Sequence, residues 1–319
     1  MRQADFTGQT APAQPPSAPL VAIGVCTFRR PILIRTLESL AAQTLVKRGN
    51  CCVIIADNDD EPSAQALVDA ARASFPVPLH YVHAPARNIS IARNALLETA
   101  ADLGADFLAK IDDDEVATPD WAQALLSEIT RSGADAVLGP VLATYRDETP
   151  GWMRKAGLHD VRPVIQPDGR ILTGYTGNVI LRLKSPHLHA RRFDLAYGRT
   201  GGEDDAFFRG MVRDGGRIGH APHAIAHEEV PPARESLRFL LRRSFRAGQT
   251  LARIGASDQT TRPVALFAKA AGKAAILTAW SGATAFSPAK RTRALMRAAL
   301  QAGVCSQVLG GNILELYRS

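Results

Sequence analysis

The feature that most constrains this chain is an alternation of short apolar runs with segments of helical periodicity. Residues 21–27 are apolar, 33–45 have the spacing of an amphipathic helix, and 51–56 are apolar again before a turn at 57–60. The same rhythm predicts helices at 63–74 and 89–103 and strands at 79–82 and 107–111. Strands that alternate with helices indicate an α/β fold with a doubly wound, mostly parallel sheet.

The ends of these strands indicate where a ligand binds. In doubly wound sheets, ligands lie beyond the carboxyl ends of the strands. We therefore expect the loops at 27–30, 57–60 and 112–115 to converge on one crevice.

The chain divides into three predicted parts. Residues 1–20 are rich in proline and poor in large apolar side chains, which indicates a disordered segment without the apolar region of a signal peptide. Residues 21–233 are expected to form the catalytic domain, in which 145–172 is an insertion or lid. Residues 234–319 have helical patterns and form a predicted C-terminal helical extension. The catalytic domain is expected to comprise a nucleotide-binding half at 21–115 and an acceptor half at 116–233.

Composition narrows the class of protein. A chain of 319 residues that is 46% hydrophobic can bury a large core, and no apolar run reaches the ~20 residues of a membrane-spanning helix. The four cysteines have no disulfide or metal-site spacing, which predicts a reducing, cytoplasmic compartment. A net charge of +7 suits nucleic acid, anionic lipid and phosphate-bearing ligands equally.

The sharpest chemical feature is a run of four carboxylates directly after an apolar strand: Asp112, Asp113, Asp114 and Glu115. Four like charges repel one another unless a cation joins them, and ions such as Mg²⁺ bind one or two carboxylates together with phosphate oxygens. The run therefore predicts a site for a metal and a diphosphate. The alternative is a solvated acidic turn that caps a helix beginning near 118–120.

A second acidic run, Glu203, Asp204 and Asp205, follows Gly201 and Gly202. Glycine lets the backbone approach a ligand closely, and a carboxylate at such a place is a candidate general base. The commoner role of acidic residues there is to stabilise the start of a helix.

Histidine and arginine residues add weaker candidates. His227 ends a predicted strand and can either complete a metal shell or hydrogen-bond within the fold. Arg93 can pair with phosphate, and the arginines of 238–246 can form a basic helix face toward phosphate or a membrane. Residues 264–286 are mildly apolar but interrupted by lysines, so they suit either a membrane surface or ordinary packing.

Taken in chain order, these motifs resemble those of family 2 glycosyltransferases with the GT-A fold, including bacterial enzymes that build exopolysaccharide and succinoglycan-type glucosyltransferases. The resemblance covers roughly residues 20–250. It implies that Thr27, Phe28 and Arg30 bind the nucleotide sugar, with Phe28 stacked near the base. It also implies that Asp57 and Asn58 hydrogen-bond the base.

The resemblance assigns roles to the acidic runs as well. Residues 112–114 look like the family's DXD motif, so Asp114 is the implied metal ligand, while Asp112 and Asp113 face the ribose and the metal. Residues 88–94 are similar to a glycine-x-x-x-alanine-arginine-asparagine segment that contains Arg93, although Asn88 replaces the glycine.

The acceptor side follows from the same resemblance. Asp204 is the implied general base, with Glu203 as the alternative, and His227 falls where some members add a metal ligand. The implied pocket for acceptor and donor sugar comprises Thr176, Gly177, Asn178 and Gly202.

Together these features imply an inverting transferase that uses Mn²⁺ or Mg²⁺, a UDP-sugar donor and a glycan or lipid-linked acceptor in bacterial cell-surface polysaccharide synthesis. Residues 242–249 are only partly similar to the motif of processive synthases and lack its tryptophan, so we expect one sugar per encounter. The implied location is cytoplasmic, with peripheral contact to the inner membrane.

Two other functions fit parts of the pattern. A nucleotidyltransferase also combines such a sheet with metal-binding aspartates, but no glycine-rich, lysine-containing phosphate loop follows the first strand. A basic protein that binds membrane or nucleic acid without catalysis would use the region from 234 to 253. With 6% aromatic residues and no nucleic-acid motif, no nucleic-acid partner is expected.

Overall fold

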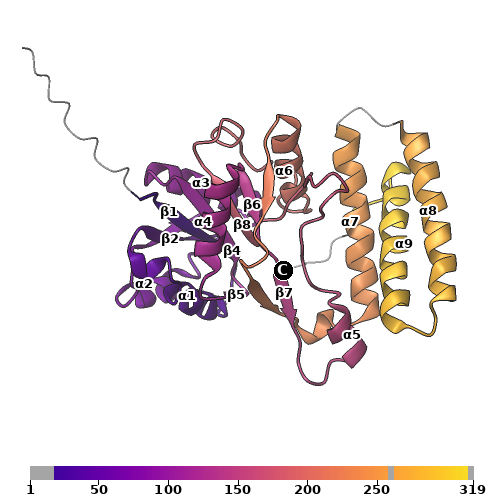
Figure 1. The fold of residues 1–319 in the computed structure, drawn as a ribbon, viewed down its shortest axis with the longest axis horizontal. Helices are drawn as coiled ribbons and strands as arrows, with labels where there is room; N and C mark the ends of the chain where they lie inside the picture. Colours follow the sequence, from indigo (N-terminus) through magenta and orange to yellow (C-terminus); the bar gives the residue numbers. More distant parts are fainter. Residues whose placement is uncertain (1–17, 258–261, 315–319) are drawn as a thin grey trace, which may run out of the picture.

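The computed structural model describes residues 18–257 and 262–314, so most of the predicted segment at 1–20 lies outside the described residues. Its main sheet has seven strands in the order β3-β2-β1-β4-β8-β6-β9, and β8 alone runs antiparallel to its neighbours (Figure 1). This confirms the predicted α/β class. The strands are β1 (Val21–Thr27), β2 (Cys51–Asp57), β3 (Leu79–His83), β4 (Phe107–Asp112), β6 (Ala136–Leu138), β8 (Asn178–Arg182) and β9 (Ile218–His220).

Helices cover both faces of this sheet, because alternate residues of the buried strands point to opposite sides. Val21 and Ile23 of β1 pack with one core cluster, whereas Ala22 and Cys26 pack with the other. The first face is covered by α1 (Leu33–Ala41), α2 (Gln65–Arg72) and α4 (Trp121–Ser132). The second face is covered by α3 (Ile89–Asp102) and α6 (Glu203–Arg213).

The first helix is shorter than the sequence pattern predicts. The pattern extends to residue 45, but α1 ends at Ala41 and a short 3-10 helix, η1 (Val46–Arg48), follows. The cause is Gln43, which is fully buried and donates its side-chain amide to the carbonyl oxygens of Ser39 and Thr118.

A second, three-stranded sheet adjoins the carboxyl end of β4. It contains β5 (Glu115–Ala117), β10 (Ala226–Glu229) and β7 (Val141–Thr144), in that order. Glu228 of β10 is paired with Glu115 of β5. This sheet therefore brings residues 226–229 beside the acidic turn that follows β4.

The predicted insertion at 145–172 is partly packed against the C-terminal helices. It contains the short helix α5 (Gly151–Ala156), and isolated bridges join Val141 to Val161 and Ile165 to Ile171. Met153 and Leu158 pack with Leu240 in a small core cluster. The first part of the insertion therefore packs as part of the fold. The predicted closure of its remainder over the site, as a lid, stays a prediction.

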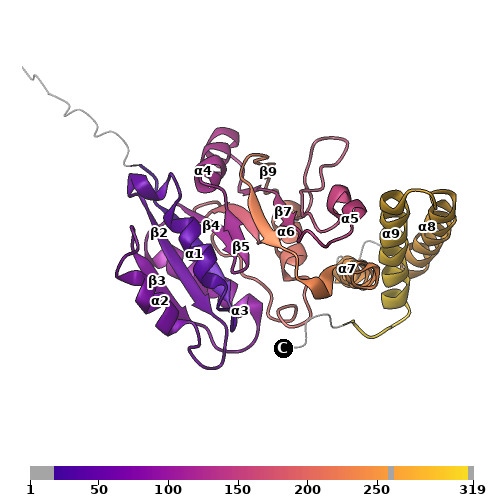
Figure 2. The ribbon, with the colours of Figure 1, turned by 90° about the horizontal axis from the view of Figure 1, so that it is seen from below.

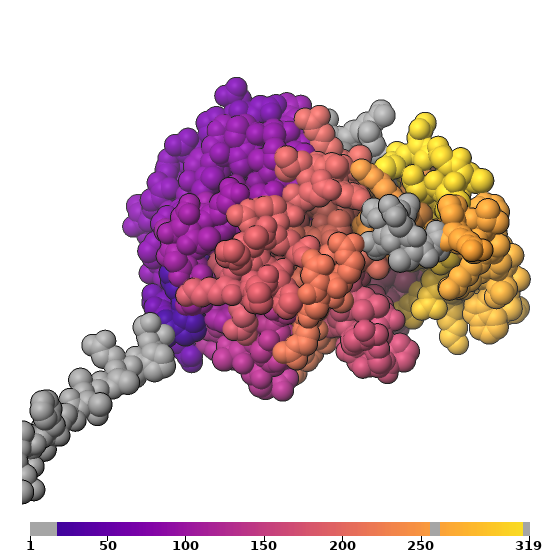
Figure 3. Space-filling model, turned by 90° about the horizontal axis from the view of Figure 1, so that it is seen from above, coloured from indigo at the N-terminus to yellow at the C-terminus, as the bar shows by residue number. Residues whose placement is uncertain are grey.

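The C-terminal region is helical, with α9 at its centre. It comprises η2 (Pro232–Arg234), α7 (Leu237–Ser257), α8 (Pro263–Ala283) and α9 (Pro288–Val308). Glycines allow α7 and α9 to approach closely, since a Cβ at Gly248 would lie 1.9 Å from the Leu300 carbonyl oxygen. Figures 1 and 2 show α8 at the outer edge, and the space-filling view in Figure 3 shows this region beside the α/β part. Over residues 18–257 and 262–314, no helix is both long and apolar enough to cross a membrane.

Candidate active site

The carboxylates that follow β4 form a strand-end cluster, defined as Asp112, Asp113, Asp114 and Glu115. Asp113 and Glu115 are buried. The hydroxyl of Thr27 donates to Asp113 Oδ2 at 2.8 Å, and the Asp112 amide donates to Glu115 Oε2 at 3.2 Å. Because β1 and β4 are adjacent and parallel, their carboxyl ends bring Thr27 to this turn, as the sequence predicts.

The buried carboxylates of the strand-end cluster are harder to ionise than carboxylates in water. Burial raises the pKa of Asp113 to about 7, although Arg30 opposes the rise. Burial also raises the pKa of Glu115 well above its usual range, and repulsion from Asp112 adds to that rise. The pKa of Asp112 is raised by burial as well. A cation at this turn would relieve the repulsion between the carboxylates.

Arg30 is the basic side chain that reaches this cluster from the loop after β1. Its Nη1 lies 2.6 Å from Asp114 Oδ2, and its Nε lies 3.7 Å from Asp113 Oδ1. The Arg30 side chain is exposed, so it can exchange these carboxylates for a phosphate at little cost.

Two further carboxylates, Glu203 and Asp204, start helix α6 and form a helix-start pair. The helix follows Gly202, whose φ of 103° is a left-handed conformation that favours glycine. Arg93 Nη1 forms an ion pair with Glu203 Oε1 and lies 2.7 Å from Asp204 Oδ1. The Asp204 side chain is 23% exposed against 10% for Glu203, so Asp204 is the more accessible base.

Glu203 is placed to support Arg93 more than to accept a substrate proton. Burial raises the pKa of Glu203, and Arg93 partly offsets the rise. Within the described residues, Glu203 Oε2 and Arg93 Nε are buried without a hydrogen-bond partner. The Oε2 atom of Glu203 is therefore shielded both from solvent and from an acceptor substrate.

Two adjacent residues before β8 touch both groups of carboxylates. The amide and hydroxyl of Thr176 donate to Asp204 Oδ2 at 3.1 Å each. A Cβ at Gly177 would lie 2.7 Å from Glu115 Oε1 and 3.0 Å from Asp112 Oδ2. Consecutive Cα atoms are ~3.8 Å apart, so the strand-end cluster and the helix-start pair line one site. Thr176 and Gly177 are where the sequence predicts the sugar pocket.

Other predicted residues hold the fold, and their expected roles need correction. Asp57 is fully buried, and it accepts hydrogen bonds from the Ala64 amide at 2.8 Å and the Tyr81 hydroxyl at 2.9 Å. Asn58 is also buried and donates its side-chain amide to the Ala84 carbonyl oxygen at 2.8 Å. These side chains build the turn after β2, and the structure does not present them to a base.

Asn178 and Gly202 also differ from their predicted places in the sugar pocket. Asn178 is fully buried, and its side chain accepts from Trp121 Nε1 at 2.8 Å and donates to the Ala224 carbonyl oxygen at 2.7 Å. A Cβ at Gly202 would lie 2.6 Å from Thr250 Cγ2 on α7. Asn178 therefore faces the core, and Gly202 faces the C-terminal helices.

His227 shares a small cavity with Asp114 but not with the rest of the strand-end cluster. The cavity has a volume of about 240 Å³, and Arg35 also lines it. Successive strand residues face opposite sides, so the neighbouring Glu228 faces the other way, toward its partner Glu115. Burial and the charge of Asp114 raise the pKa of Glu228. The structure thus adds Glu228 to the carboxylates around the turn, whereas a joint role of His227 with Asp112 lacks support.

Phe28 remains a predicted stacking partner of the nucleotide base. It is half-buried directly after β1, and the Arg29 guanidinium carbon lies 5.3 Å from its ring centroid. Arg29 has a φ of 52° and pairs with Asp59 at 2.7 Å.

Lys110 was not among the predicted site residues, yet it lies beneath the site. It is buried in β4, and its ammonium nitrogen is 5.9 Å from the Phe193 ring centroid. Burial lowers the pKa of Lys110. The sequence does contain a hint: a lysine two residues before Asp112 in a strand must share its face.

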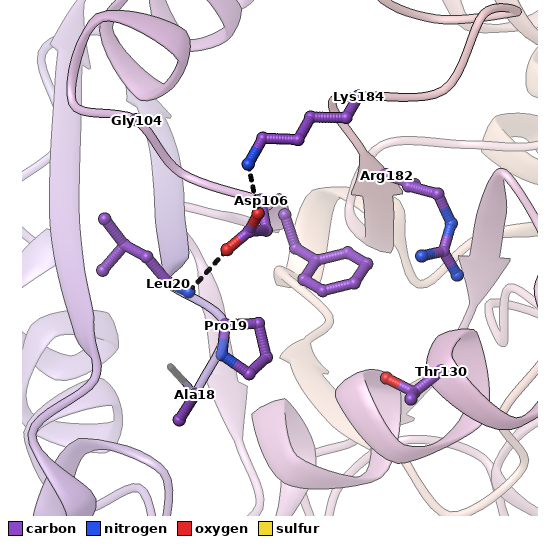
Figure 4. A pocket seen from close by; sticks show the side chains of 9 residues that line it. Ala18, Pro19, Leu20, Gly104, Asp106, Thr130, Arg182 and Lys184 are labelled. Atoms are coloured by element: carbon purple, nitrogen blue, oxygen red, sulfur yellow. Dashed lines mark hydrogen bonds and ion pairs between the residues drawn. The ribbon is translucent and has the colours of Figure 1, made fainter. Parts of the chain in front are cut away.

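A hollow larger than the His227 cavity lies at the opposite end of the sheet. It has a volume of about 580 Å³ and is lined by Leu20, Asp106 and Lys184, among others. Figure 4 shows Asp106 accepting a hydrogen bond from the Leu20 amide and pairing with Lys184. This hollow adjoins the amino ends of β1 and β4, away from the carboxylates.

The donor set of the strand-end cluster fits a hard divalent cation. Among the residues that the structure describes, no group of three or more histidine, cysteine, aspartate or glutamate side chains is arranged to hold a metal ion. Mg²⁺-type sites, however, need only one or two protein carboxylates together with substrate phosphates and water. Asp112 and Asp114 meet this requirement, and Gly177 packs so closely against Asp112 and Glu115 that a side chain would not fit there.

The comparisons of this chain with a family model and with a known protein agree with each other. The model of the family described as glycosyl transferase family 2 matches residues 22–197. The chain is 46% identical over 296 residues to the succinoglycan biosynthesis protein ExoM of Rhizobium meliloti (strain 1021), with 92% of this chain and 94% of that protein covered.

Solved structures share the fold at low sequence identity. The mannosyltransferase PcManGT from Pyrobaculum calidifontis, in complex with GDP-Man and Mn²⁺, is 18% identical with a TM-score of 0.58 over 92% of this chain and 88% of its own. S. aureus TarS 1–349 in complex with UDP is 16% identical with a TM-score of 0.50, over 94% and 93%. These neighbours confirm the predicted GT-A fold.

Proposed function

The chain belongs to glycosyl transferase family 2 and is a glycosyltransferase, and we propose that it moves a sugar from a nucleotide sugar to an acceptor hydroxyl with inversion. One observation carries this proposal. Thr176 contacts the candidate base Asp204, while the adjacent Gly177 lies against Asp112 of the candidate diphosphate site. A base and a diphosphate site on either side of one sugar are what a single displacement requires.

In the proposed reaction, Asp204 accepts the proton of the acceptor hydroxyl as its oxygen bonds to the anomeric carbon. The bond from that carbon to the nucleoside diphosphate breaks in the same step. Arg93 and Thr176 hold Asp204 in place, because both donate to the carboxylate. Glu203 holds Arg93 from the other side.

Asp112 and Asp114 would hold Mn²⁺ or Mg²⁺, and such a cation stabilises the negative charge of the departing diphosphate. The crowding of buried carboxylates in the strand-end cluster supports this assignment, as does the Mn²⁺ bound by the structural neighbour PcManGT. We propose that Thr27 orients Asp113 toward the nucleotide, and that Arg30 moves from Asp114 to a phosphate.

UDP is the proposed nucleotide, and a UDP-hexose is the proposed donor. TarS was solved with UDP, although PcManGT holds GDP-Man. The name of the relative ExoM, a succinoglycan biosynthesis protein, supports a role in succinoglycan-type exopolysaccharide synthesis. We propose that the acceptor is a glycan or a lipid-linked saccharide. We place the protein in the cytoplasm, with peripheral contact to the inner membrane.

Thermal unfolding tests nucleotide and metal together. Stability is measured with UDP, GDP, CMP and ADP, each with Mn²⁺ or with a chelator. A diphosphate at ~100 times its dissociation constant adds ~2.7 kcal/mol to the free energy of unfolding. We expect UDP to stabilise the protein only with Mn²⁺. Stabilisation by none of the four overturns the proposed donor site, and metal-dependent stabilisation by GDP alone would replace UDP with GDP as the proposed nucleotide.

A further inference from the structure

All of the chain's excess positive charge lies in one segment. Residues 262–314 contain seven lysines and arginines and no aspartate or glutamate. Without those seven, the chain's 38 basic residues become 31, which equals its 31 acidic residues. The segment forms α8 and α9, so the net charge of +7 is concentrated on two adjacent helices.

The side chains of these basic residues are exposed, so they can contact a charged surface. All seven are exposed: Arg262, Lys269, Lys273, Lys290, Arg291, Arg293 and Arg297. With no carboxylate in the segment, local ion pairs along α8 and α9 do not neutralise them. By contrast, some basic residues of α7 contact the α/β part, as when Arg246 donates to the Thr200 carbonyl oxygen at 2.6 Å.

Large apolar side chains are exposed among these cations. Ile276 is 70% exposed, Trp280 is 60% exposed, and Phe286, in the connection between α8 and α9, is fully exposed. Lys273, Ile276 and Trp280 follow one another at intervals of three and four residues, which places them on one flank of α8. Figures 1 and 2 show that this helix forms the outer edge of the molecule.

The apolar and basic side chains meet where α8 ends and α9 begins. We define the α8–α9 tip as the exposed flank of α8 with the start of α9: Lys269, Lys273, Ile276, Trp280, Phe286, Lys290 and Arg291. Arg293, one turn further along α9, donates to the Ala156 carbonyl oxygen of α5 at 2.5 Å. This contact ties the α8–α9 tip to the insertion of the α/β part, so a surface bound by the tip has a fixed orientation to the rest of the molecule.

We propose that the α8–α9 tip docks on a bilayer surface with anionic headgroups. Aromatic and aliphatic side chains at the tip would enter the headgroup region, and the surrounding lysines and arginines would contact lipid phosphates. The charge pattern favours lipid over a protein partner, because α8 and α9 offer no carboxylate to pair with a partner's basic groups. No helix in the described ranges is able to span the bilayer, so the contact lies at the surface.

This inference rests on the proposed function, which includes peripheral contact with the membrane. It adds which surface of the protein makes that contact and which lipids the surface meets. It also explains why the cations are gathered on the helices farthest from the sheet. A lipid-linked acceptor held at the same bilayer would reach the enzyme from the side of α5 and the C-terminal helices. The test uses vesicles alone, so its outcome does not depend on transfer activity.

Flotation of the full-length protein with vesicles of phosphatidylcholine, with and without phosphatidylglycerol, tests the proposal. We expect binding only with phosphatidylglycerol, and weaker binding at high salt. Trp280→Ser with Phe286→Ser should lower the partition coefficient by about 100-fold or more, because two large apolar side chains no longer leave water. Lys269→Gln with Lys273→Gln should lower it by about 25-fold.

Matched control variants separate the tip from general surface effects. Leu103→Ser removes an exposed apolar side chain directly after α3, and Lys47→Gln with Arg48→Gln removes two exposed charges from η1. Both should bind vesicles like the unmodified protein. Stabilisation by nucleotide in solution should be unchanged in every variant, which distinguishes this proposal from the proposed donor site.

Three outcomes would overturn the proposal. One is equal vesicle binding by the unmodified protein and both tip variants. Another is self-association in solution that the Trp280→Ser and Phe286→Ser changes abolish, since the tip would then contact a second copy of the chain. The third is binding to polynucleotides that the Lys269→Gln and Lys273→Gln changes remove while vesicle binding persists.

Discussion

The strand-end cluster and the helix-start pair both place carboxylates at the same site, but their charges are balanced differently. In the strand-end cluster, burial raises the pKa of Asp113 to about 7 and that of Glu115 well above its usual range. In the helix-start pair, one buried guanidinium, that of Arg93, forms ion pairs with both carboxylates. Burial thus makes the strand-end carboxylates harder to ionise, whereas both carboxylates of the helix-start pair share one buried cationic partner.

This difference separates two chemical tasks. A divalent cation binds best where carboxylates crowd together, because its charge removes their repulsion. A general base has to stay ionised in a stable place while keeping a lone pair for the incoming proton. Asp204 is suited to this task by its position, since Arg93 and Thr176 donate to it and part of its side chain remains exposed.

The largest expected effect comes from removing the base. Asp204→Asn should lower turnover by ~10² to 10⁴-fold, because the amide cannot accept the acceptor proton. Affinity for the nucleotide should persist, since Asp204 lies on the acceptor side. Initial rates with donor and acceptor, together with calorimetry of nucleotide binding, check both statements.

Asp205→Asn is the matched control for that variant. Asp205 is the next residue of α6, but it accepts from the Thr173 hydroxyl at 2.5 Å and does not contact Arg93. Its turnover should stay close to normal. Equal loss in both variants would show that the helix start is needed for folding and not specifically for proton transfer.

The strand-end cluster should respond to a different change. Asp114→Ala should weaken nucleoside diphosphate binding in Mn²⁺ by about 100-fold, to the level found with a chelator. Calorimetry with and without Mn²⁺ measures this loss. As the control, Asp60→Ala removes a carboxylate that pairs with Arg87 at 2.7 Å, and it should leave the metal dependence intact. Metal dependence that survives in Asp114→Ala would remove that residue from the metal site.

The two groups should also differ in their pH dependence. Asp113 has a folded pKa of about 7, above its unfolded value of 3.8. Between these values the folded state binds more protons, so this group lowers stability as pH rises. We expect metal-free protein to lose about 2–3 kcal/mol between pH 5 and pH 8 from this source. Asp113→Asn should flatten that dependence in thermal unfolding, and an unchanged slope would contradict the assignment.

Thr176 joins the two groups, and its hydroxyl is expected to position the base. Thr176→Val should lower turnover about tenfold, because Asp204 loses one donor to its charged form. It should also move the acidic limb of the pH–rate profile upward, since the carboxylate becomes easier to protonate. Thr173→Val removes a hydroxyl that donates to Asp205 instead, and its profile should not move. A fall in turnover without a shift in the profile would indicate a packing role only.

Much of the fold is readable from the sequence because β1 and β2 are buried on both faces and appear as continuous apolar runs. The second sheet is not readable in this way. Its strands β5, β10 and β7 are short, and they come from distant parts of the chain. Their pairing depends on contacts that no local pattern contains.

The same limit applies to the site. The rule that ligands lie at the carboxyl ends of strands correctly brings Thr27 to Asp113. The role of Asn178 depends instead on Trp121, which lies on a helix far away in the chain. The role of Gly202 depends on Thr250 of α7. A motif gives the position of a residue along the chain, whereas the direction of its side chain is set by the partner it meets.

Residues 227 and 228 give the finest test of how far the strand-end cluster extends. Glu228 is paired with Glu115 across two strands and lies near Asp114. Its carboxylate forms an ion pair with Arg234 at 2.6 Å, whereas His227 lies on the opposite face. We therefore expect Glu228→Gln to weaken Mn²⁺-dependent nucleotide binding by about three- to fivefold, as for one partly exposed charge. His227→Ala should change it less than that, because only Asp114 shares its cavity. A larger loss in His227→Ala would mean that the cation is held from the His227 side of β10. The carboxylates on the Glu228 side would then serve a different purpose.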